Sequence, residues 1–294
     1  MDYPGLVIVD VFAEQKYAGN QLAVVTNGRG LSGERMQQIA REFNFSETTF
    51  ILSGRQENGG YDVRIFTPGE EVPFAGHPTV GTAWVIRNLL DQARPDMVRL
   101  NLKVGQIPVA FDADTEIAWM TTQEPVFGET LPPAMLADVL GVDRNDIETR
   151  FPIQVVSTGL PAILVPIMTL RAIQGVRVRI DLLQDLAKTH DAGKTVLVFC
   201  RETLSKENQL HVRVFGPLVG VPEDPATGSA NSCLAGYLLR HRYFGEGPVD
   251  AKVEQGYEMG RPSKVHLRAR QTTKGPIEVQ VGGKVQFVAK GELV

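Results

Sequence analysis

Two short polar segments, one in each half of the chain, carry side chains that can bind and release protons. Residues 75–79 contain His77, and residues 223–229 contain Asp224 and Ser229. Each segment lies between a predicted strand and a predicted helix, with a proline in the expected first helical turn, where a missing N–H group is tolerated. The glycines let backbone N–H groups approach a ligand, and a helix N-terminus attracts an anion. The two segments therefore predict a site for a small carboxylated molecule.

A comparison of the two halves indicates an internal repeat. Residues 63–68 match residues 212–217, an offset of 149, and residues 78–83 match residues 225–230, an offset of 147. Both offsets are about half the chain length, and the matches keep their order. The repeat predicts two similar lobes with an active site in the cleft between them, because clefts commonly hold small molecules.

The same alignment places His77 opposite Asp224, so that equivalent helix starts present an imidazole in one lobe and a carboxylate in the other. Such a pair suits acid–base catalysis. The alternative is that Asp224 only caps a helix and that His77 is a hydrogen-bonded turn residue. Thr79, Thr227 and Ser229 supply more polar groups than capping needs, which favours a site.

Glu47 is a third candidate for proton transfer. It begins an apolar, β-branched segment within residues 45–50. Burial there would raise the pKa of the carboxyl group toward the value that a general acid or base needs. The alternative is a surface glutamate between a helix and a strand.

The composition excludes several classes of protein. The 294 residues suffice for two domains, and 43% hydrophobic with 22% charged residues is typical of a globular chain. A formal net charge of −4 offers no positive field to attract nucleic acid or an anionic membrane. Apolar stretches fall short of the roughly 20 residues of a membrane span. We therefore expect a small molecule as the partner, rather than nucleic acid or a membrane.

Cysteine and histidine spacing argues against a metal site. Cys200 and Cys233 form no CxxC motif and are predicted to be core thiols, and the five histidines form no HxxxH or HExxH motif. The N-terminal residues lack the basic start and long apolar core of a signal peptide. We therefore expect a cytoplasmic protein that binds no metal.

The predicted elements favour an α+β fold. Strands outnumber helices without regular βαβ spacing, which indicates curled mixed sheets around central helices rather than a doubly wound parallel sheet. The best-defined helix spans residues 32–44, with Ser32 as its N-cap. Further helices are predicted over residues 79–90, 182–188 and 230–240. Strands are predicted near residues 6–12, 22–26, 48–52, 61–66, 98–103, 106–111, 116–120, 153–156, 162–167, 196–200 and 210–215, and in a final run after residue 240.

Several motifs, in order and at compatible spacing, make the chain resemble the PhzF phenazine-biosynthesis family over nearly its whole length. The motifs are Gly19-Asn20, residues 31–50, Phe66-Thr67-Pro68, residues 73–78, residues 224–230 and residues 256–263. The resemblance implies a fold like that of diaminopimelate epimerase, with two pseudo-symmetric lobes. We expect the N-terminal lobe over residues 1–126, completed by a last strand over residues 284–294, and the C-terminal lobe over residues 127–283.

The resemblance also implies an activity. The type member of the family isomerises trans-2,3-dihydro-3-hydroxyanthranilate with a glutamate and without a cofactor or metal. The resemblance also implies a homodimer. The glutamate role maps onto Glu47. Polar roles toward the substrate and in proton transfer map onto His77, Asp224 and Ser229. Substrate binding maps onto Asn20, the amides of Gly76 and Gly228, and the neighbouring Ser46.

Three other interpretations fit the sequence less well. Residues 28–33 formally satisfy GxGxxG, but the next strand lacks the ribose-binding acid of a nicotinamide site, so a turn before an N-cap is preferred. A two-thiolate racemase is disfavoured because Ala75 and the Asp224-Pro225 pair stand where related racemases carry cysteines. A non-catalytic binding or scaffold protein that keeps the fold would not need Glu47.

Overall fold

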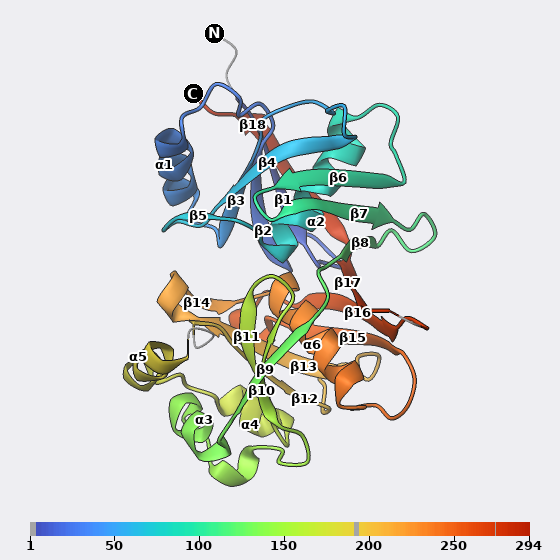
Figure 1. Cartoon of the computed structure of the whole chain (residues 1–294). Helices are drawn as coiled ribbons and strands as arrows, with labels where there is room; N and C mark the ends of the chain where they lie inside the picture. The colour runs from blue at the N-terminus through green and yellow to red at the C-terminus, as the bar shows by residue number, and fades with distance from the viewer. Residues whose placement is uncertain (1–3, 191–193, 274) are drawn as a thin grey trace. The chain divides into compact units, whose positions relative to one another are not determined.

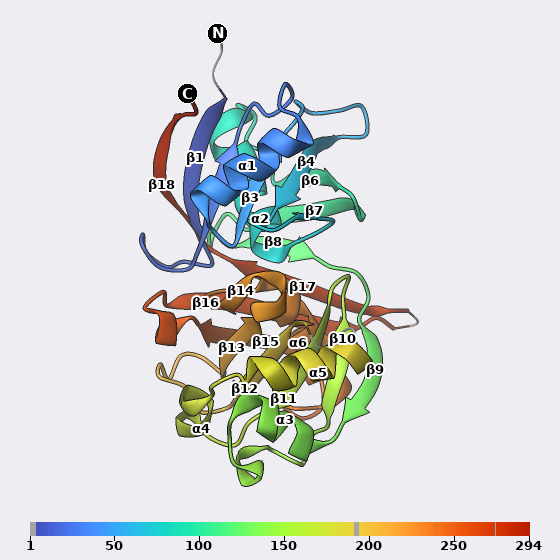
Figure 2. The same ribbon diagram turned by 90° about the vertical axis from the view of Figure 1, so that its left-hand side faces the viewer.

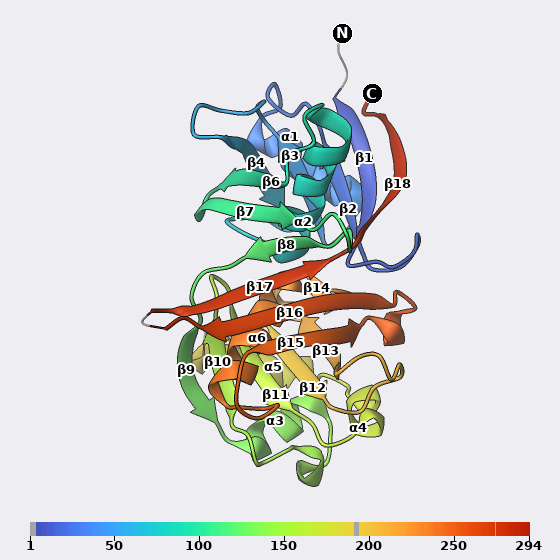
Figure 3. The same cartoon turned by 90° about the vertical axis from the view of Figure 1, so that its right-hand side faces the viewer.

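The structure, a computed structural model, describes residues 4–190, 194–273 and 275–294. The chain divides into two compact units. Unit 1 comprises Met1–Thr121 and Gly282–Val294, and unit 2 comprises Thr122–Val281. The last strand therefore returns to the first unit, and Figure 3 shows it beside the first strand of the chain.

Unit 1 is a curled mixed sheet around one helix. Its elements are β1 (Gly5–Val11), β2 (Asn20–Val25), α1 (Gly33–Phe43), β3 (Glu47–Ile51), β4 (Gly60–Phe66), β5 (Glu71–Val72), α2 (Gly76–Val85), a π-helical turn (Ile86–Leu90), β6 (Met97–Leu102), β7 (Gly105–Phe111), β8 (Ala118–Thr121) and β18 (Val285–Glu292). β2 runs parallel to β3, β4 runs parallel to β6, and the other neighbouring pairs are antiparallel.

The helix α2 lies inside this sheet. Every residue of α2 except Trp84 is buried, and the helix contacts β1, β2, β3, β6, β7, β8 and β18 (Figure 1). A helix that is apolar all round belongs in a core. By contrast, α1 is amphipathic and lies against the outside of the sheet (Figure 2), where Met36 and Ala40 pack on Phe50 and Phe66.

Unit 2 repeats this plan. Its elements are β9 (Val126–Leu131), α3 (Pro133–Leu140), β10 (Ile153–Ser157), β11 (Pro161–Pro166), α4 (Leu170–Gly175), α5 (Ile180–Thr189), β12 (Val196–Cys200), β13 (Leu210–Gly216), β14 (Val221–Asp224), α6 (Gly228–Arg240), β15 (Val249–Gln255), β16 (Ser263–Gln271) and β17 (Ile277–Gly283). β11 runs parallel to β12 and β13 runs parallel to β15, as β2/β3 and β4/β6 do in unit 1. The central helix is α6, which is buried over most of its length.

One side-chain pair recurs at equivalent positions of the two units. In unit 1, the guanidinium of Arg64 on β4 donates two hydrogen bonds to Glu71 on β5, at 2.8 and 2.7 Å. In unit 2, Arg213 on β13 donates two to Glu223 on β14, both at 2.8 Å. Each arginine also lies over the ring of the phenylalanine two residues further along its strand. These pairs confirm the predicted repeat and the predicted pseudo-symmetric α+β fold.

The register of the repeat after these strands was predicted wrongly. The helices begin at Gly76 and Gly228, which are 152 residues apart, so His77 corresponds to Ser229 and not to Asp224. In both helices the fourth residue bonds back to the carbonyl of the N-cap, Thr79 Oγ1 to Ala75 O at 2.7 Å and Asn231 Nδ2 to Thr227 O at 3.0 Å. The small residues that suggested the other alignment are common in helix starts and carry little register information.

Other boundaries also differ from the prediction. The helices expected from residues 79 and 230 begin three and two residues earlier, and in α2 the first turn includes Pro78, which is tolerated there. Pro225 precedes the N-cap Thr227 and is therefore not in the first turn of α6. Gly28 forms a turn with Leu31, and Ser32 caps α1 by accepting the N–H of Arg35, so the GxGxxG segment is the predicted turn before an N-cap.

Candidate active site

Three predicted residues of unit 1 lie together, and we call Asn20, Glu47 and His77 the Glu47 cluster. Asn20 begins β2 and Glu47 begins the parallel neighbour β3, so both stand at the same end of the sheet. His77 is the second residue of α2. Asn20 Nδ2 lies 3.1 Å from His77 Nδ1, and His77 Nε2 lies 3.5 Å from Glu47 Oε2.

Local backbone geometry sets these positions. Gly19, just before Asn20, has a φ of +67°, and a Cβ there would lie 2.4 Å from the carbonyl oxygen of Val11. Only glycine fits this turn. Asn44 ends α1 in the left-handed conformation, so the chain turns sharply through the partly exposed Ser46 into Glu47. The cluster is therefore built by two tight turns and one helix start.

Burial decides the charge of His77. Its side chain is 3% exposed, and desolvation lowers its pKa from the usual 6.5 to about 3. The imidazole is therefore neutral near pH 7. The Asn20 amide nitrogen faces Nδ1 and the Glu47 carboxylate faces Nε2, an arrangement that favours the tautomer with the ring proton on Nε2. Glu47 itself is 16% exposed and remains accessible from one side.

We expect the His77 ring to stay neutral across the pH range in which the protein is folded. Two-dimensional ¹H–¹⁵N NMR of the ring should show the Nε2–H tautomer and no titration between pH 5 and 9, because the buried site disfavours the imidazolium. A His77 ring that gains a proton between pH 5 and 8 would contradict this assignment.

One predicted residue of unit 2, Asp224, belongs to a second group, the Asp224 cluster, made of Asp224, Thr227, Asn231 and Gln255. Asp224 ends β14, and the Thr227 hydroxyl donates to its Oδ2 at 2.5 Å. Gln255 at the end of β15 bonds to Thr227, to Asn231 and to the backbone of Asp224. Sequence analysis missed Gln255 and Asn231, because partners 24 to 31 residues away leave no local pattern.

Both central helices begin without the usual side-chain cap. Ala75, the N-cap of α2, has no capping group, and Thr227, the N-cap of α6, makes no capping bond within the described residues. Asp224 is not the N-cap of α6, so that alternative is wrong. Gly76 and Gly228 are the first residues of these helices, and Ser229 is the second residue of α6. A helix start of this kind suits an anion such as a carboxylate.

The two cysteines are core thiols, as predicted. Both are buried, and burial raises the pKa of Cys200 to about 12 and that of Cys233 to about 11. Such thiols are protonated and poor nucleophiles near neutral pH. They therefore supply no thiolate pair for racemisation.

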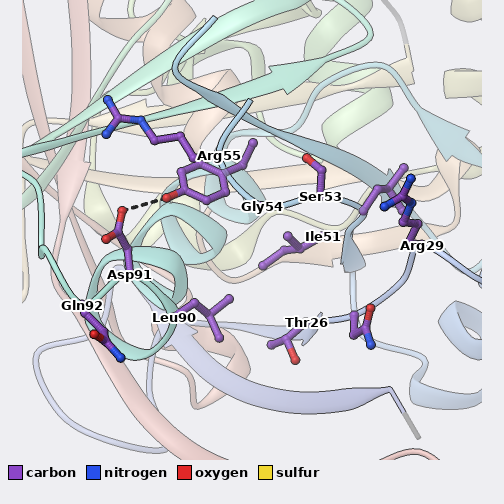
Figure 4. A pocket seen from close by; sticks show the side chains of 12 residues that line it. Thr26, Arg29, Ile51, Ser53, Gly54, Arg55, Leu90, Asp91 and Gln92 are labelled. Atoms are coloured by element: carbon purple, nitrogen blue, oxygen red, sulfur yellow. Dashed lines mark hydrogen bonds between the residues drawn. The ribbon is translucent and has the colours of Figure 1, made fainter. Parts of the chain in front are cut away.

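Figure 4 shows a cavity of about 640 Å³ in unit 1 that does not include the Glu47 cluster. It lies at the carboxyl ends of β2 and β3, next to Thr26 and Ser53, whereas Asn20 and Glu47 stand at the opposite ends of the same strands. Tyr61 donates a hydrogen bond to Asp91 at its rim. Sequence analysis singled out none of its lining residues except as parts of strands and turns.

A buried charged group in unit 2 was also missed, and we call His211, Glu254 and Glu258 the His211 triad. His211 Nδ1 lies 2.8 Å from Glu254 Oε1, and its Nε2 lies 3.0 Å from Glu258 Oε1. Burial alone would lower the pKa of His211, but the bonds to the two carboxylates outweigh it and raise the pKa. The same bonds hold the pKa values of both glutamates below their usual range, despite burial.

Comparison with known proteins places these features in a family. The model of the PhzC-PhzF family, described as phenazine biosynthesis-like protein, matches residues 9–291. The chain belongs to this family. It is 35% identical to the trans-2,3-dihydro-3-hydroxyanthranilate isomerase of Pseudomonas aeruginosa, with 97% of each chain covered. The chain is thus an isomerase of the PhzF type.

Solved structures agree. A phenazine biosynthesis protein of the PhzF family from Bacillus anthracis superposes with a TM-score of 0.89 over the whole of both chains, at 26% identity. A probable proline racemase from Agrobacterium radiobacter, 11% identical and covering 99% of this chain and 93% of its own, has a TM-score of 0.65 and shows the shared fold alone. The predicted family and fold are confirmed.

Among residues 4–190, 194–273 and 275–294, no three His, Cys, Asp or Glu side chains are grouped so that they could hold a metal ion. No helix in that part of the chain is both long and apolar enough to cross a membrane.

Proposed function

We propose that this isomerase moves a proton between carbon atoms of a small, cyclic, carboxylated metabolite, with Glu47 as the acid and base and without a cofactor. The observation that carries the proposal is the Glu47 cluster, in which a partly exposed carboxylate lies 3.5 Å from a neutral imidazole. A neutral His77 puts no positive charge beside Glu47, so it does not lower the basicity of the carboxylate. An imidazolium in its place would weaken Glu47 as a base.

The chemistry requires one group in two protonation states. The Glu47 carboxylate removes a proton from a substrate carbon, and the electron pair of the broken C–H bond enters the conjugated system of the ring. The carboxyl group then returns the proton to another ring carbon, so that no atom or electron is gained or lost. Asn20 fixes the His77 ring through Nδ1, and the Nε2–H group can donate to Glu47 or to the substrate as charge develops.

Substrate binding is proposed for the helix starts and the Asp224 cluster. The N–H groups around Gly76 and Gly228 suit the substrate carboxylate, because both helices lack a side-chain cap among the described residues. Asp224 and Ser229 are proposed to hold polar substrate groups. The homodimer, the cytoplasmic location and the independence from metals stay predictions.

The first substrate to test is the one in the name of the P. aeruginosa relative. trans-2,3-Dihydro-3-hydroxyanthranilate carries a carboxylate and an amino group on a partly unsaturated ring, as the proposal requires. Purified protein should isomerise it in heavy water, with deuterium appearing in the product at one carbon by NMR. A reaction without protein is the control.

Two other outcomes of this experiment would change the proposal. Deuterium exchange into a different carboxylated metabolite, without turnover of this one, would keep the proton-transfer mechanism and change the substrate. Tight binding of carboxylated ring compounds with neither turnover nor exchange would contradict the catalytic proposal and indicate a binding protein.

A further inference from the structure

The side chain of Gln255 is completely buried and contacts the turn between β14 and α6. Its Nε2 lies 2.7 Å from the backbone oxygen of Asp224 and 3.1 Å from Thr227 Oγ1. Its Oε1 lies 3.3 Å from the Thr227 backbone nitrogen and 2.8 Å from Asn231 Nδ2. One amide thus makes four hydrogen bonds to the residues around Asp224.

These partners fix which end of the amide is which. A backbone carbonyl can only accept, so the group facing Asp224 O is the NH₂ of Gln255. A backbone N–H can only donate, so the group facing the Thr227 nitrogen is the Gln255 carbonyl oxygen. The orientation of the Gln255 side chain therefore follows from its backbone contacts alone.

The orientation of Gln255 in turn fixes the Thr227 hydroxyl. Because the NH₂ of Gln255 donates to Thr227 Oγ1, the hydroxyl hydrogen is directed at its other close partner, Asp224 Oδ2. Threonine is a favoured N-cap whose oxygen normally accepts an N–H of the first helical turn. Within the described part of the chain, Thr227 makes no such bond. Its hydroxyl donates to Asp224 instead.

Gln255 is itself held firmly in place. The next residue, Gly256, has a φ of +76°, and a Cβ there would lie 2.6 Å from the carbonyl oxygen of Pro225. The preceding residue, Glu254, is buried in the His211 triad and also accepts the side-chain amide of Asn208 at 2.7 Å. The end of β15 is thus anchored on both sides of Gln255.

We propose that Gln255 is a positioning residue, which directs the Thr227 hydroxyl to Asp224 and keeps the Thr227 side chain from capping α6. The proposal rests on the proposed function, in which Asp224 and the start of α6 hold the substrate. Gln255 touches no substrate in this scheme. It acts through the Thr227 hydroxyl, and its bond to the backbone of Asp224 holds its own amide in place.

Two variants of Gln255 test the proposal by kinetics. Gln255→Glu keeps the shape but turns the donor toward Asp224 O into an acceptor, and Gln255→Met removes all four bonds. We expect kcat to fall about tenfold or more in both, because misplaced binding groups slow the reaction strongly. Gln154→Met, a partly buried amide on β10, should leave kcat unchanged.

A double variant separates positioning from stability. If Gln255 acts through the hydroxyl, Gln255→Met should add little to the loss already caused by Thr227→Val, whereas Thr227→Ser should restore the rate. Full kcat in folded Gln255→Met, or additive losses in the double variant, would overturn the proposal.

A measurement without substrate keeps the proposal independent of the reaction. Amide hydrogen exchange of Thr227 should quicken about tenfold or more in Gln255→Met, because its N–H loses the Gln255 oxygen, while the amides of β12 keep their protection. If the wild-type protein turns over no substrate, the proposed function fails and this exchange still decides whether Gln255 holds the turn. Unchanged exchange at Thr227 would refute the positioning role.

Discussion

Glu47→Gln should lower kcat by at least about 100-fold and leave KM within a few-fold of wild type. The amide has nearly the same shape and can still lie 3.5 Å from His77 Nε2, but it cannot take a proton from carbon. General acid–base groups contribute roughly this much to a rate. The loss should therefore appear in kcat, with binding preserved.

The measurement is steady-state kinetics of wild type and variant on the same substrate, together with deuterium uptake into the product. Glu42→Gln is the matched control, because Glu42 is an exposed glutamate of α1 in the same unit. It should be indistinguishable from wild type. Near-normal turnover by Glu47→Gln would assign the acid–base role to another residue.

His211→Gln should lower the free energy of unfolding by about 3 kcal/mol near neutral pH, because breaking a buried ion pair strands a buried charge. Glu254 is completely buried, and in the variant it would lose its cationic partner and keep only the N–H donors of Leu204, Ser205 and Asn208. Urea unfolding followed by circular dichroism measures the change. This is the largest stability effect that we expect from a single side chain of unit 2.

The stability that His211 contributes should depend on pH. The pKa of His211 is raised in the folded protein, so the stability that its charge supplies is fully present below its unfolded pKa and is lost as pH rises through the raised value. The difference between wild type and His211→Gln should therefore shrink in alkaline solution. On the acid side, the lowered pKa values of Glu254 and Glu258 predict a loss of stability as pH falls through them.

His190→Gln is the control for this experiment. His190 pairs with Glu129, which is more than half exposed, so the pair is solvent-screened and its removal should change stability by less than about 1 kcal/mol. An equal effect of the two substitutions, or a pH-independent loss in His211→Gln, would show that the His211 triad is not held together by charge.

The sequence predicted correctly those features that depend on residues close together in the chain. The 3.6-residue period of α1, the cap at Ser32 and the repeated strands could all be read locally, and the motifs around Glu47 and His77 named residues that do lie together. The register of the repeat was wrong, because small residues at helix starts are interchangeable. Gln255 and the His211 triad were missed, because their partners come from distant segments and only the folded chain brings them together.

The return of β18 to unit 1 has a consequence for how the chain is made. β1 pairs with β18 along its whole length, from Gly5 with Glu292 to Val11 with Val285. During synthesis β1 is made before unit 2, whereas its partner β18 is made after unit 2. Unit 2 lies entirely within the intervening chain and can fold while synthesis continues, as domains generally do. Until β18 has been made, β1 has an open sheet edge, which nascent chains must protect from aggregation.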